Sequence, residues 1–256
     1  MSFDLTAPVF ERQRRLPEGV PDAIRSAILS LLPERRAPRI LDIGAGTGRI
    51  GRAFVNAGDR YVGLDLSLGM LREFGAKDAV LLQADAEHLP FADYTFSAVL
   101  LIQVLSGARD WTRLLEEARR VLAEGAPLIL GHTVTPKNGV DVQLKEHLYA
   151  ILHRRGISPG ENMQNRDRAL QLLASTSKKC EHIIVASWSA ARTSREFLER
   201  HRTGARFSAL PVAVQQSALD ELKSWAERRF GSLDRVLPEE HTFQLHAFTF
   251  GENGEN

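Results

Sequence analysis

The feature that most constrains the fold is a short apolar strand that runs directly into three alternating glycines. The segment reads Arg39-Ile-Leu-Asp-Ile-Gly-Ala-Gly-Thr-Gly-Arg49, and the helix-forming run 50–55 follows it. Glycine tolerates a left-handed backbone and lets the chain approach a ligand closely, and the start of a helix presents unpaired amides. We therefore expect a strand, a tight turn and a helix, with a polar cofactor at the turn.

The spacing of the glycines narrows the choice of cofactor. A dinucleotide-binding turn reads G-x-G-x-x-G and would need glycine at position 49, where this chain has Arg49. A phosphate-binding loop needs a lysine followed by serine or threonine, and residues 44–49 contain no lysine. The pattern argues against NAD and against a nucleoside triphosphate. For this segment alone, a glycine-rich turn without a ligand is the alternative.

Two aspartates follow later apolar runs. Tyr61-Val-Gly-Leu-Asp65 ends in a carboxylate, which at the end of a parallel strand can accept both hydrogens of a ribose diol. A third run, 79–83, leads to Asp85, whose side chain together with the backbone amide of Ala86 can read the edge of an adenine. Each aspartate alone is also typical of a helix cap or a turn. All three signals in this order favour a cofactor that contains adenosine.

These segments resemble the class I S-adenosylmethionine-dependent methyltransferases, in particular the small-molecule branch that includes the quinone-biosynthesis methyltransferases. The segments that match the motifs of this family, in chain order, are 40–48, 62–71, 83–91, 96–100, 116–122 and 125–130. The resemblance covers about residues 36–135. The whole chain resembles uncharacterised bacterial methyltransferases of similar length, which supply no substrate.

The resemblance, together with the alternation of apolar strands and amphipathic helices, implies an α/β fold. We expect one Rossmann-like methyltransferase domain over residues 1–256, with a seven-stranded, mostly parallel sheet, helices on both faces and a helical cap. By resemblance, the last strand is antiparallel. Residues 36–135 would form the cofactor-binding core. Residues 137–178 and 190–240 would be insertions that form the cap and set substrate specificity.

The resemblance also implies which residues bind the cofactor, S-adenosyl-L-methionine, whose product is S-adenosyl-L-homocysteine. The glycines would meet the methionine part, Asp42 would orient its ammonium group, and Asp65 would bind the ribose. Asp85 and Ala86 would bind the adenine, and Gln103 would lie beside the methionine or the transferred methyl group. The full expected set is Asp42, Gly44, Ala45, Gly46, Gly48, Asp65, Leu66, Met70, Asp85, Ala86 and Gln103. No metal site is expected.

His132 is the candidate catalytic residue. It follows the expected fifth strand, and ligands of parallel α/β sheets bind at the carboxyl ends of the strands. If the methyl acceptor is a hydroxyl, His132 would be the best-placed general base, with His147, Tyr149 and His153 as further candidates on a predicted helix. The alternative for His132 is a hydrogen-bonded structural histidine.

Composition excludes several other classes of protein. The chain has 256 residues, 43% of them hydrophobic, and a formal net charge of +1, so it can bury a large core and has no general attraction to nucleic acid or anionic membranes. Cys180 is the single cysteine, which excludes an intramolecular disulfide. No apolar stretch approaches the roughly 20 residues that span a bilayer, and no signal segment is apparent, so we expect a cytoplasmic protein.

Three functions are compatible with these observations. The first is a methyltransferase that acts on a small molecule, as a monomer or homodimer. The second is a tRNA or protein methyltransferase, against which stand the near-neutral charge and the lack of an appended basic domain. The third is a protein that binds the cofactor without catalysis or uses it for other chemistry. The sequence leaves open the acceptor and the atom that is methylated.

Overall fold

The glycine turn follows a strand at the middle of a sheet. This strand, β1 (Arg39–Ile43), pairs in parallel with β2 (Arg60–Asp65) on one side and with β4 (Ala98–Ile102) on the other. Beyond them, β3 (Val80–Gln83) pairs in parallel with β2, and β5 (Leu128–Val134) pairs in parallel with β4. After β1 the chain continues to β2 and β3 on one side, and it then crosses to β4 and β5 on the other side of β1. Ligands of α/β sheets bind at the carboxyl ends of the strands where the order reverses in this way.

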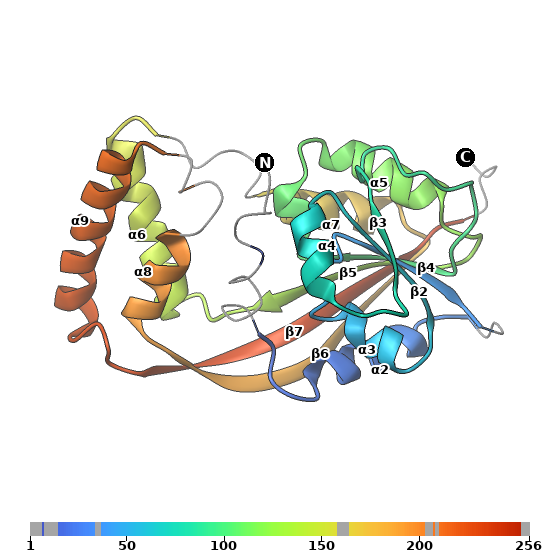
Figure 1. The fold of residues 1–256 in the computed structure, drawn as a ribbon, viewed down its shortest axis with the longest axis horizontal. Coiled ribbons are helices and arrows are strands. Elements are labelled where there is room, and N and C mark those ends of the chain that lie inside the picture. The colour runs from blue at the N-terminus through green and yellow to red at the C-terminus, as the bar shows by residue number, and fades with distance from the viewer. Residues whose placement is uncertain are drawn as a thin grey trace. The chain divides into compact units, whose positions relative to one another are not determined.

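The structure is a computed structural model that describes residues 7, 15–33, 37–157, 164–202, 207 and 210–251. Its described strands form a seven-stranded sheet in the order β3-β2-β1-β4-β5-β7-β6 (Figure 1). This order and the helices on both faces confirm the expected Rossmann-like class I architecture.

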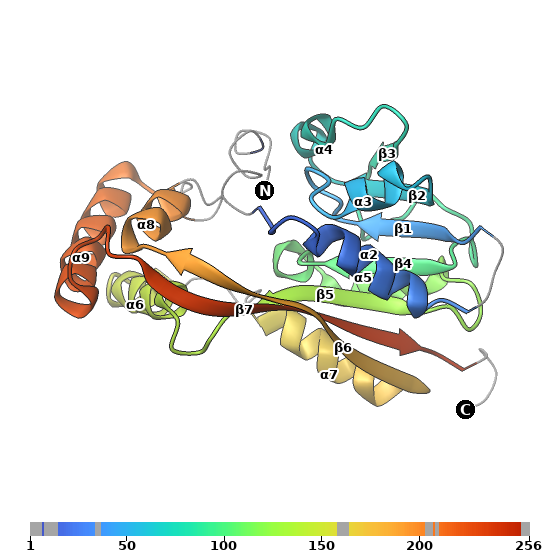
Figure 2. The same cartoon turned by 90° about the horizontal axis from the view of Figure 1, so that it is seen from below.

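The last two strands, β6 (Lys179–Arg192) and β7 (Leu237–Thr249), run in opposite directions. The backbone N of Lys178 donates to the O of Thr249, and the side chain of His182 bonds that of Gln244, so residue numbers fall along one strand as they rise along the other. The arrow of β7 also points opposite to those of β5 and β6 (Figure 2). The β6 strand extends beyond the expected segment 182–187 at both ends, and β7 begins before the expected segment 242–250.

Helices cover both faces of the sheet. On one face, α5 (Trp111–Arg120) and α7 (Asn165–Thr176) pack against alternate residues of the parallel strands. On the other face, α2 (Val20–Ser30) packs against α3 (Gly51–Asn56), and the Phe54 ring of α3 stacks on Tyr61 of β2. Buried side chains shared by the strands, α5 and α7 include Leu41, Leu64, Val99, Leu101, Leu128, Leu130, Leu114, Leu115, Ala118, Ala169 and Leu173.

Local sequence signals explain where two of these helices begin. The carboxylate of Asp110 accepts hydrogen bonds from the backbone N of Thr112 and of Arg113, which caps the start of α5. Ser67 caps α4 (Leu68–Phe74) by accepting from the backbone N of Met70. A short 3-10 helix, η1 (Leu105–Gly107), follows β4.

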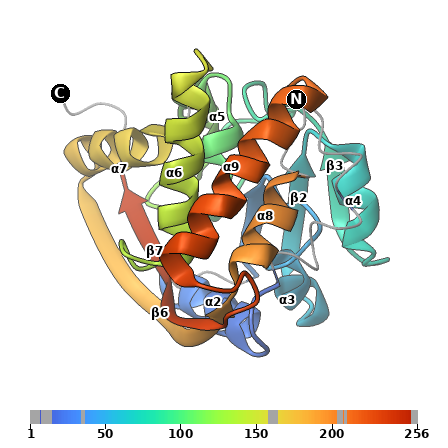
Figure 3. The ribbon, with the colours of Figure 1, turned by 90° about the vertical axis from the view of Figure 1, so that its left-hand side faces the viewer.

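A second compact unit comprises Val134–Gly160 and Ser187–Thr242. Its described part contains α6 (Val140–Arg154), α8 (Ser194–Arg202) and α9 (Val212–Phe230), which pack side by side (Figure 3). The α9 helix has the bounds that the sequence predicts, with Gly231 after its last residue. The core of this unit is built from Val140, Leu144, Leu148, Ile151, Leu152, Phe197, Ala218, Leu219, Leu222 and Ala226.

The segment 137–178 contributes to both compact units. The reason is that Ala169 and Leu173 of α7 belong to the core beneath the sheet, whereas α6 packs on α8 and α9. Residues 158–163 of that insertion lie outside the described residues. Among the helices that the structure describes, none is both long and apolar enough to cross a membrane.

Glu117 is a buried acid that joins α5 to the loop before β4. Its carboxylate accepts a hydrogen bond from the backbone N of Leu89 at 2.8 Å and from Arg120 at 2.8 and 2.9 Å. The side chain of Arg120 also donates to the backbone O of Leu89 and of Phe91. The bond to Arg120 is the main reason why the pKa of Glu117 is lowered from 4.5 to about 2.

We expect Glu117→Gln to lower the free energy of unfolding at pH 7 by about 2 kcal/mol, because a buried charged acceptor is lost. Because the pKa of the folded state lies below that of the unfolded state, this stability is present above pH 4.5 and is lost as the pH falls toward about 2. Urea unfolding of both proteins across this range measures the difference, which should shrink on acidification. A difference that stays constant would contradict the assignment.

Candidate functional site

The turn after β1 is held by the end of β2. The backbone N of Gly44 and of Ala45 both donate to the O of Leu64, at 2.7 and 3.0 Å. The backbone N of Gly46 donates to the carboxylate of Asp65 at 2.9 Å. Gly44, Gly46 and Gly48 have φ angles of 80°, 57° and 78°, a region that side chains rarely adopt. The sequence therefore folds locally into the tight turn that the glycine pattern predicts.

The three glycines serve different purposes. A Cβ on Gly44 would lie 2.5 Å from a methyl carbon of Val104, and one on Gly48 would lie 2.6 Å from the ring of Phe74. These two glycines are needed because other parts of the protein pack closely against them. A Cβ on Gly46 would meet only the O of Gly44, at 3.9 Å. Of the three, Gly46 is therefore the position that offers room for a ligand.

Asp65 connects the glycine turn to the segment after β2. One carboxylate oxygen accepts from Gly46 N, and the other accepts from the backbone N of Ser67 at 2.8 Å. A carboxylate has about four acceptor positions, so it can accept several donors at once. The neighbouring Leu66 is 56% exposed, so it offers an apolar surface that a flat ring can cover. Met70 is buried, and its backbone N donates to Ser67, so it supports this segment from inside.

Asp85 lies after β3 and has partners of its own. It accepts from the backbone N of Glu87 at 3.0 Å and forms an ion pair with Arg109 at 3.0 Å. The same guanidinium lies 3.7 Å from Glu87. Ala86, the expected amide donor, lies between these two acids. Arg109 is a residue that the sequence reasoning did not find, because it lies in the loop after η1, where one more arginine carries no local signal.

Asp42 lies inside the protein beneath the turn. It is 3% exposed and accepts a hydrogen bond from the hydroxyl of Tyr61 at 2.7 Å. Burial raises its pKa from 3.8 to about 6; the bond from Tyr61 opposes this rise, and the nearby charge of Asp65 adds to it. The described contact of Asp42 thus faces the protein interior, where it fixes β1 to β2.

Gln103 follows β4 in a strained conformation. Its φ angle is 57°, in the left-handed region that residues other than glycine seldom occupy. Its backbone N donates to the O of Gly131, and its side-chain amide donates to the hydroxyl of Thr133 at 3.1 Å. Its side-chain oxygen accepts from the guanidinium of Arg49 at 2.5 Å. Residues after β1 and β4 and on β5 are thus joined by one chain of hydrogen bonds.

The side chain of His132 lies on the face of β5 opposite to that of Thr133. It continues the alternation of Leu128 and Leu130, which face α5 and α7, whereas the neighbouring Thr133 bonds to Gln103. His132 is 8% exposed, and its ring stacks on that of His246 of β7 with centroids 5.6 Å apart. His246 stacks in turn on His182 of β6, at 4.5 Å.

The surroundings of His132 make its imidazole a weak base. Its pKa is lowered from 6.5 to about 4, mainly by burial and also by the positive charge of Arg166 and the neighbouring His246. The described contacts therefore do not bring His132 together with Gly46, Asp65 or Gln103. The other candidates, His147, Tyr149 and His153, lie on α6 in the second unit, where His147 stacks on Trp225 at 4.2 Å.

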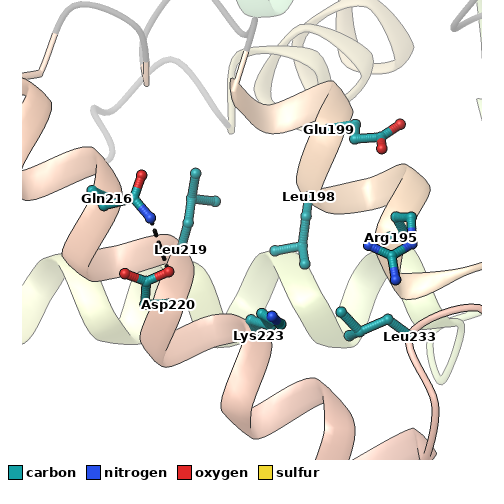
Figure 4. Close-up of a pocket in the computed structure, with 8 residues that line it drawn as sticks. All are labelled: Arg195, Leu198, Glu199, Gln216, Leu219, Asp220, Lys223 and Leu233. Carbon is teal, nitrogen blue, oxygen red and sulfur yellow. Dashed lines mark hydrogen bonds between the residues drawn. The ribbon is translucent and has the colours of Figure 1, made fainter.

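The second unit contains a separate pocket of about 310 Å³ between α8 and α9 (Figure 4). Leu198, Leu219 and Leu233 line it together with both acidic and basic side chains. Several of these charges already have partners: Arg195 pairs with Asp234, and Gln216 donates to Asp220. None of the expected cofactor-binding residues lines this pocket. Within the described part of the chain, no group of histidine, cysteine or acidic residues is arranged to hold a metal ion.

Comparison with known proteins identifies the segment that carries the glycine turn and both aspartates. Residues 41–130 match the family model described as "Methyltransferase domain". This segment of the chain is therefore similar to a methyltransferase domain. The demethylmenaquinone methyltransferase of Corynebacterium urealyticum is 36% identical over 115 residues, which are 44% of this chain and 50% of that protein. The chain thus spans about half the length of the curated relatives that it matches.

Solved structures share the fold of this chain at low identity. A putative type II methyltransferase of Anaeromyxobacter dehalogenans is 17% identical with a TM-score of 0.61, covering 93% of this chain and 98% of that one. A phosphoethanolamine N-methyltransferase of Haemonchus contortus, in complex with S-adenosylhomocysteine, is 17% identical with a TM-score of 0.52, covering 97% and 58%. The cyclase SpnF is 18% identical with a TM-score of 0.54, covering 97% and 94%. The fold is therefore shared by proteins of different chemistry.

The different surroundings of the glycines predict different costs of substitution. Gly46→Ala should lower the free energy of unfolding by about 1 kcal/mol, the cost of a side chain in left-handed backbone. Gly48→Ala should cost about 2 to 4 kcal/mol, because the new methyl group also collides with Phe74. Chemical unfolding of both variants measures this order. Equal losses would contradict the close packing of Phe74 against Gly48.

The environment of His132 predicts acid sensitivity. Because its pKa is lower in the folded state than the ordinary 6.5, stability should be fully present above pH 6.5 and fall by up to about 3 kcal/mol as the pH drops toward 4. His132→Phe retains a ring against His246 and should lose this part of the pH dependence. Unfolding measured between pH 7 and pH 4 checks it, and identical pH profiles for both proteins would rule it out.

Proposed function

We propose that this chain is an S-adenosylmethionine-dependent methyltransferase that acts on a small-molecule acceptor. The observation that carries the proposal is that the methyltransferase domain, residues 41–130, contains both a glycine turn with open space at Gly46 and the carboxylate that fixes that turn, Asp65. The expected cofactor contains a ribose and an adenine, and acceptor groups stand at the ends of β2 and β3 in the order that these parts require.

The residues present suit this cofactor. The open position at Gly46 would receive the methionine part, and Asp65 would accept the ribose hydroxyls while keeping its bonds to the turn. The exposed side chain of Leu66 would cover one face of the adenine, and Asp85, held by Arg109, would accept the adenine amino group. This assignment uses the expected residues, with Asp42, Gly44, Gly48 and Met70 supporting the turn from within.

The cofactor supplies a methyl group activated by a positively charged sulfur. Held at Gly46 and Asp65, the cofactor would supply this methyl group to a nucleophile of the acceptor, with S-adenosylhomocysteine as the second product. The acceptor loses a proton if its nucleophile carries one. The contribution of the chain is to align the reactants, which can lower a barrier by several kcal/mol. We assign no general base, because the buried ring of His132 stacks on His246, on the face of β5 that carries Leu128 and Leu130.

The acceptor class is inferred from the relatives. Proteins named demethylmenaquinone methyltransferase match this chain at 36% identity, which makes demethylmenaquinone the first acceptor to test. We assign the choice of acceptor to segments outside residues 41–130, where the family model ends. The near-neutral net charge supports a small acceptor rather than nucleic acid, and we expect a cytoplasmic monomer or homodimer.

Calorimetric titration of the purified protein with S-adenosylmethionine, S-adenosylhomocysteine and NADH tests the cofactor. Binding of the first two without NADH supports the proposal and leads to a screen for transfer of a labelled methyl group, starting with demethylmenaquinone. Binding without transfer to any acceptor would favour a cofactor-binding protein or other chemistry on this fold. Binding of NADH alone would overturn the proposal.

Asp65→Asn should weaken binding of S-adenosylhomocysteine by about 2 to 3 kcal/mol, because a charged acceptor for two hydroxyls becomes neutral. Asparagine has nearly the same shape but keeps only one of the two oxygens that accept from the backbone N of Gly46 and of Ser67, so unfolding of the variant is measured beside its affinity. The matched control is Asp78→Asn, which removes the same charge at an exposed position before β3. Calorimetry measures both variants, and an unchanged affinity of Asp65→Asn would remove the ribose assignment.

A further inference from the structure

We propose that Arg49 binds the carboxylate of the amino-acid half of the cofactor. The inference rests on the proposed function, since it concerns the same site. It assigns a role to an arginine that the sequence reasoning used only to argue against a dinucleotide.

Arg49 lies at the end of the glycine turn. The residue directly follows Gly48, so its backbone belongs to the turn that offers open space at Gly46. Its guanidinium reaches Gln103, the residue after β4, at 2.5 Å. Because β1 and β4 are neighbours and the chain leaves β1 in the other direction toward β2, this bond crosses the switch point of the sheet. Ligands of α/β sheets bind at this point.

Gln103 is held in a strained backbone conformation. Its left-handed φ of 57° is paired with a backbone bond to Gly131 and a side-chain bond to Thr133. These bonds fix the side chain so that its oxygen faces Arg49. Such strain in a residue other than glycine is concentrated at ligand sites, where it positions groups in advance. Gln103 therefore acts as a positioning residue for the guanidinium.

The charges of the ligand favour an arginine at this position. The amino-acid half of the cofactor carries an ammonium and a carboxylate, and the carboxylate needs a positively charged partner that acids such as Asp42 and Asp65 cannot provide. A guanidinium has five donors in a planar fork, so it can bind a carboxylate with two parallel bonds while it keeps its bond to Gln103. Arg49 thus supplies a positive charge at the end of the glycine turn.

The experiment compares three ligands that differ at one end. S-adenosylhomocysteine has the complete amino acid, its decarboxylated analogue retains only the ammonium, and 5′-methylthioadenosine lacks the amino acid. We expect Arg49→Gln to weaken binding of S-adenosylhomocysteine roughly 10- to 100-fold. Binding of the other two ligands should change less than about twofold. Arg49→Lys, which keeps the charge without the fork, should lose less than Arg49→Gln.

The matched control is Arg52→Gln. Arg52 lies three positions later, on α3, and its guanidinium donates to the backbone O of Glu73 and of Phe74, both at 3.0 Å. This variant should leave all three affinities unchanged.

The outcomes separate the possible roles. Equal weakening of all three ligands by Arg49→Gln would show that the arginine only holds the loop, and no weakening of any would show that it faces elsewhere; both results overturn the inference while the proposed function stands. If the wild-type protein bound none of the three, the proposed function would fail and the inference with it.

Discussion

The carboxylate of Asp65 is the group on which the candidate site depends. Its two oxygens accept backbone donors from Gly46 and Ser67, so one side chain fixes both the glycine turn after β1 and the segment after β2. A turn of alternating glycines has little conformational preference of its own, because glycine loses more backbone entropy on folding than any other residue. The bonds from Gly46 to Asp65 and from Gly44 and Ala45 to Leu64 offset that loss. The same carboxylate that would bind the ribose therefore also shapes the loop beside it.

Much of the parallel core follows from local sequence. The apolar runs before Gly44, Asp65 and Asp85 are strands, and α9 has its expected bounds, because periodicity and end signals reside in adjacent residues. The pattern does not show which glycine faces a ligand, since that depends on Val104 and Phe74, which approach from distant parts of the chain. Arg49 and Arg109 also escape prediction, because their partners Gln103 and Asp85 are remote in sequence. The division of the chain at α7 depends in the same way on which core receives its leucines.

His132 shows how a signal that was present in the sequence can be outweighed. Its position after an apolar strand suggested an active-site base, yet the alternation of Leu128, Leu130 and His132 already placed it on the face of the leucines. Only the structure supplies the remaining facts, since the stacking partner His246 and the charge of Arg166 come from more than thirty positions away. A histidine whose pKa is lowered to about 4 gives up basicity that a general base needs near neutral pH.

Binding of the cofactor and transfer of the methyl group place different demands on this chain. The groups proposed to bind the cofactor all lie within residues 41–130, the segment that matches the family model. Transfer additionally requires an acceptor aligned with the sulfur, and no described residue of the parallel core is assigned that task. The shared fold of the cyclase SpnF shows that this architecture does not by itself dictate methyl transfer. Chemistry on this fold is therefore decided by what is aligned beyond the cofactor, and acceptor specificity has to be sought in the segments outside residues 41–130.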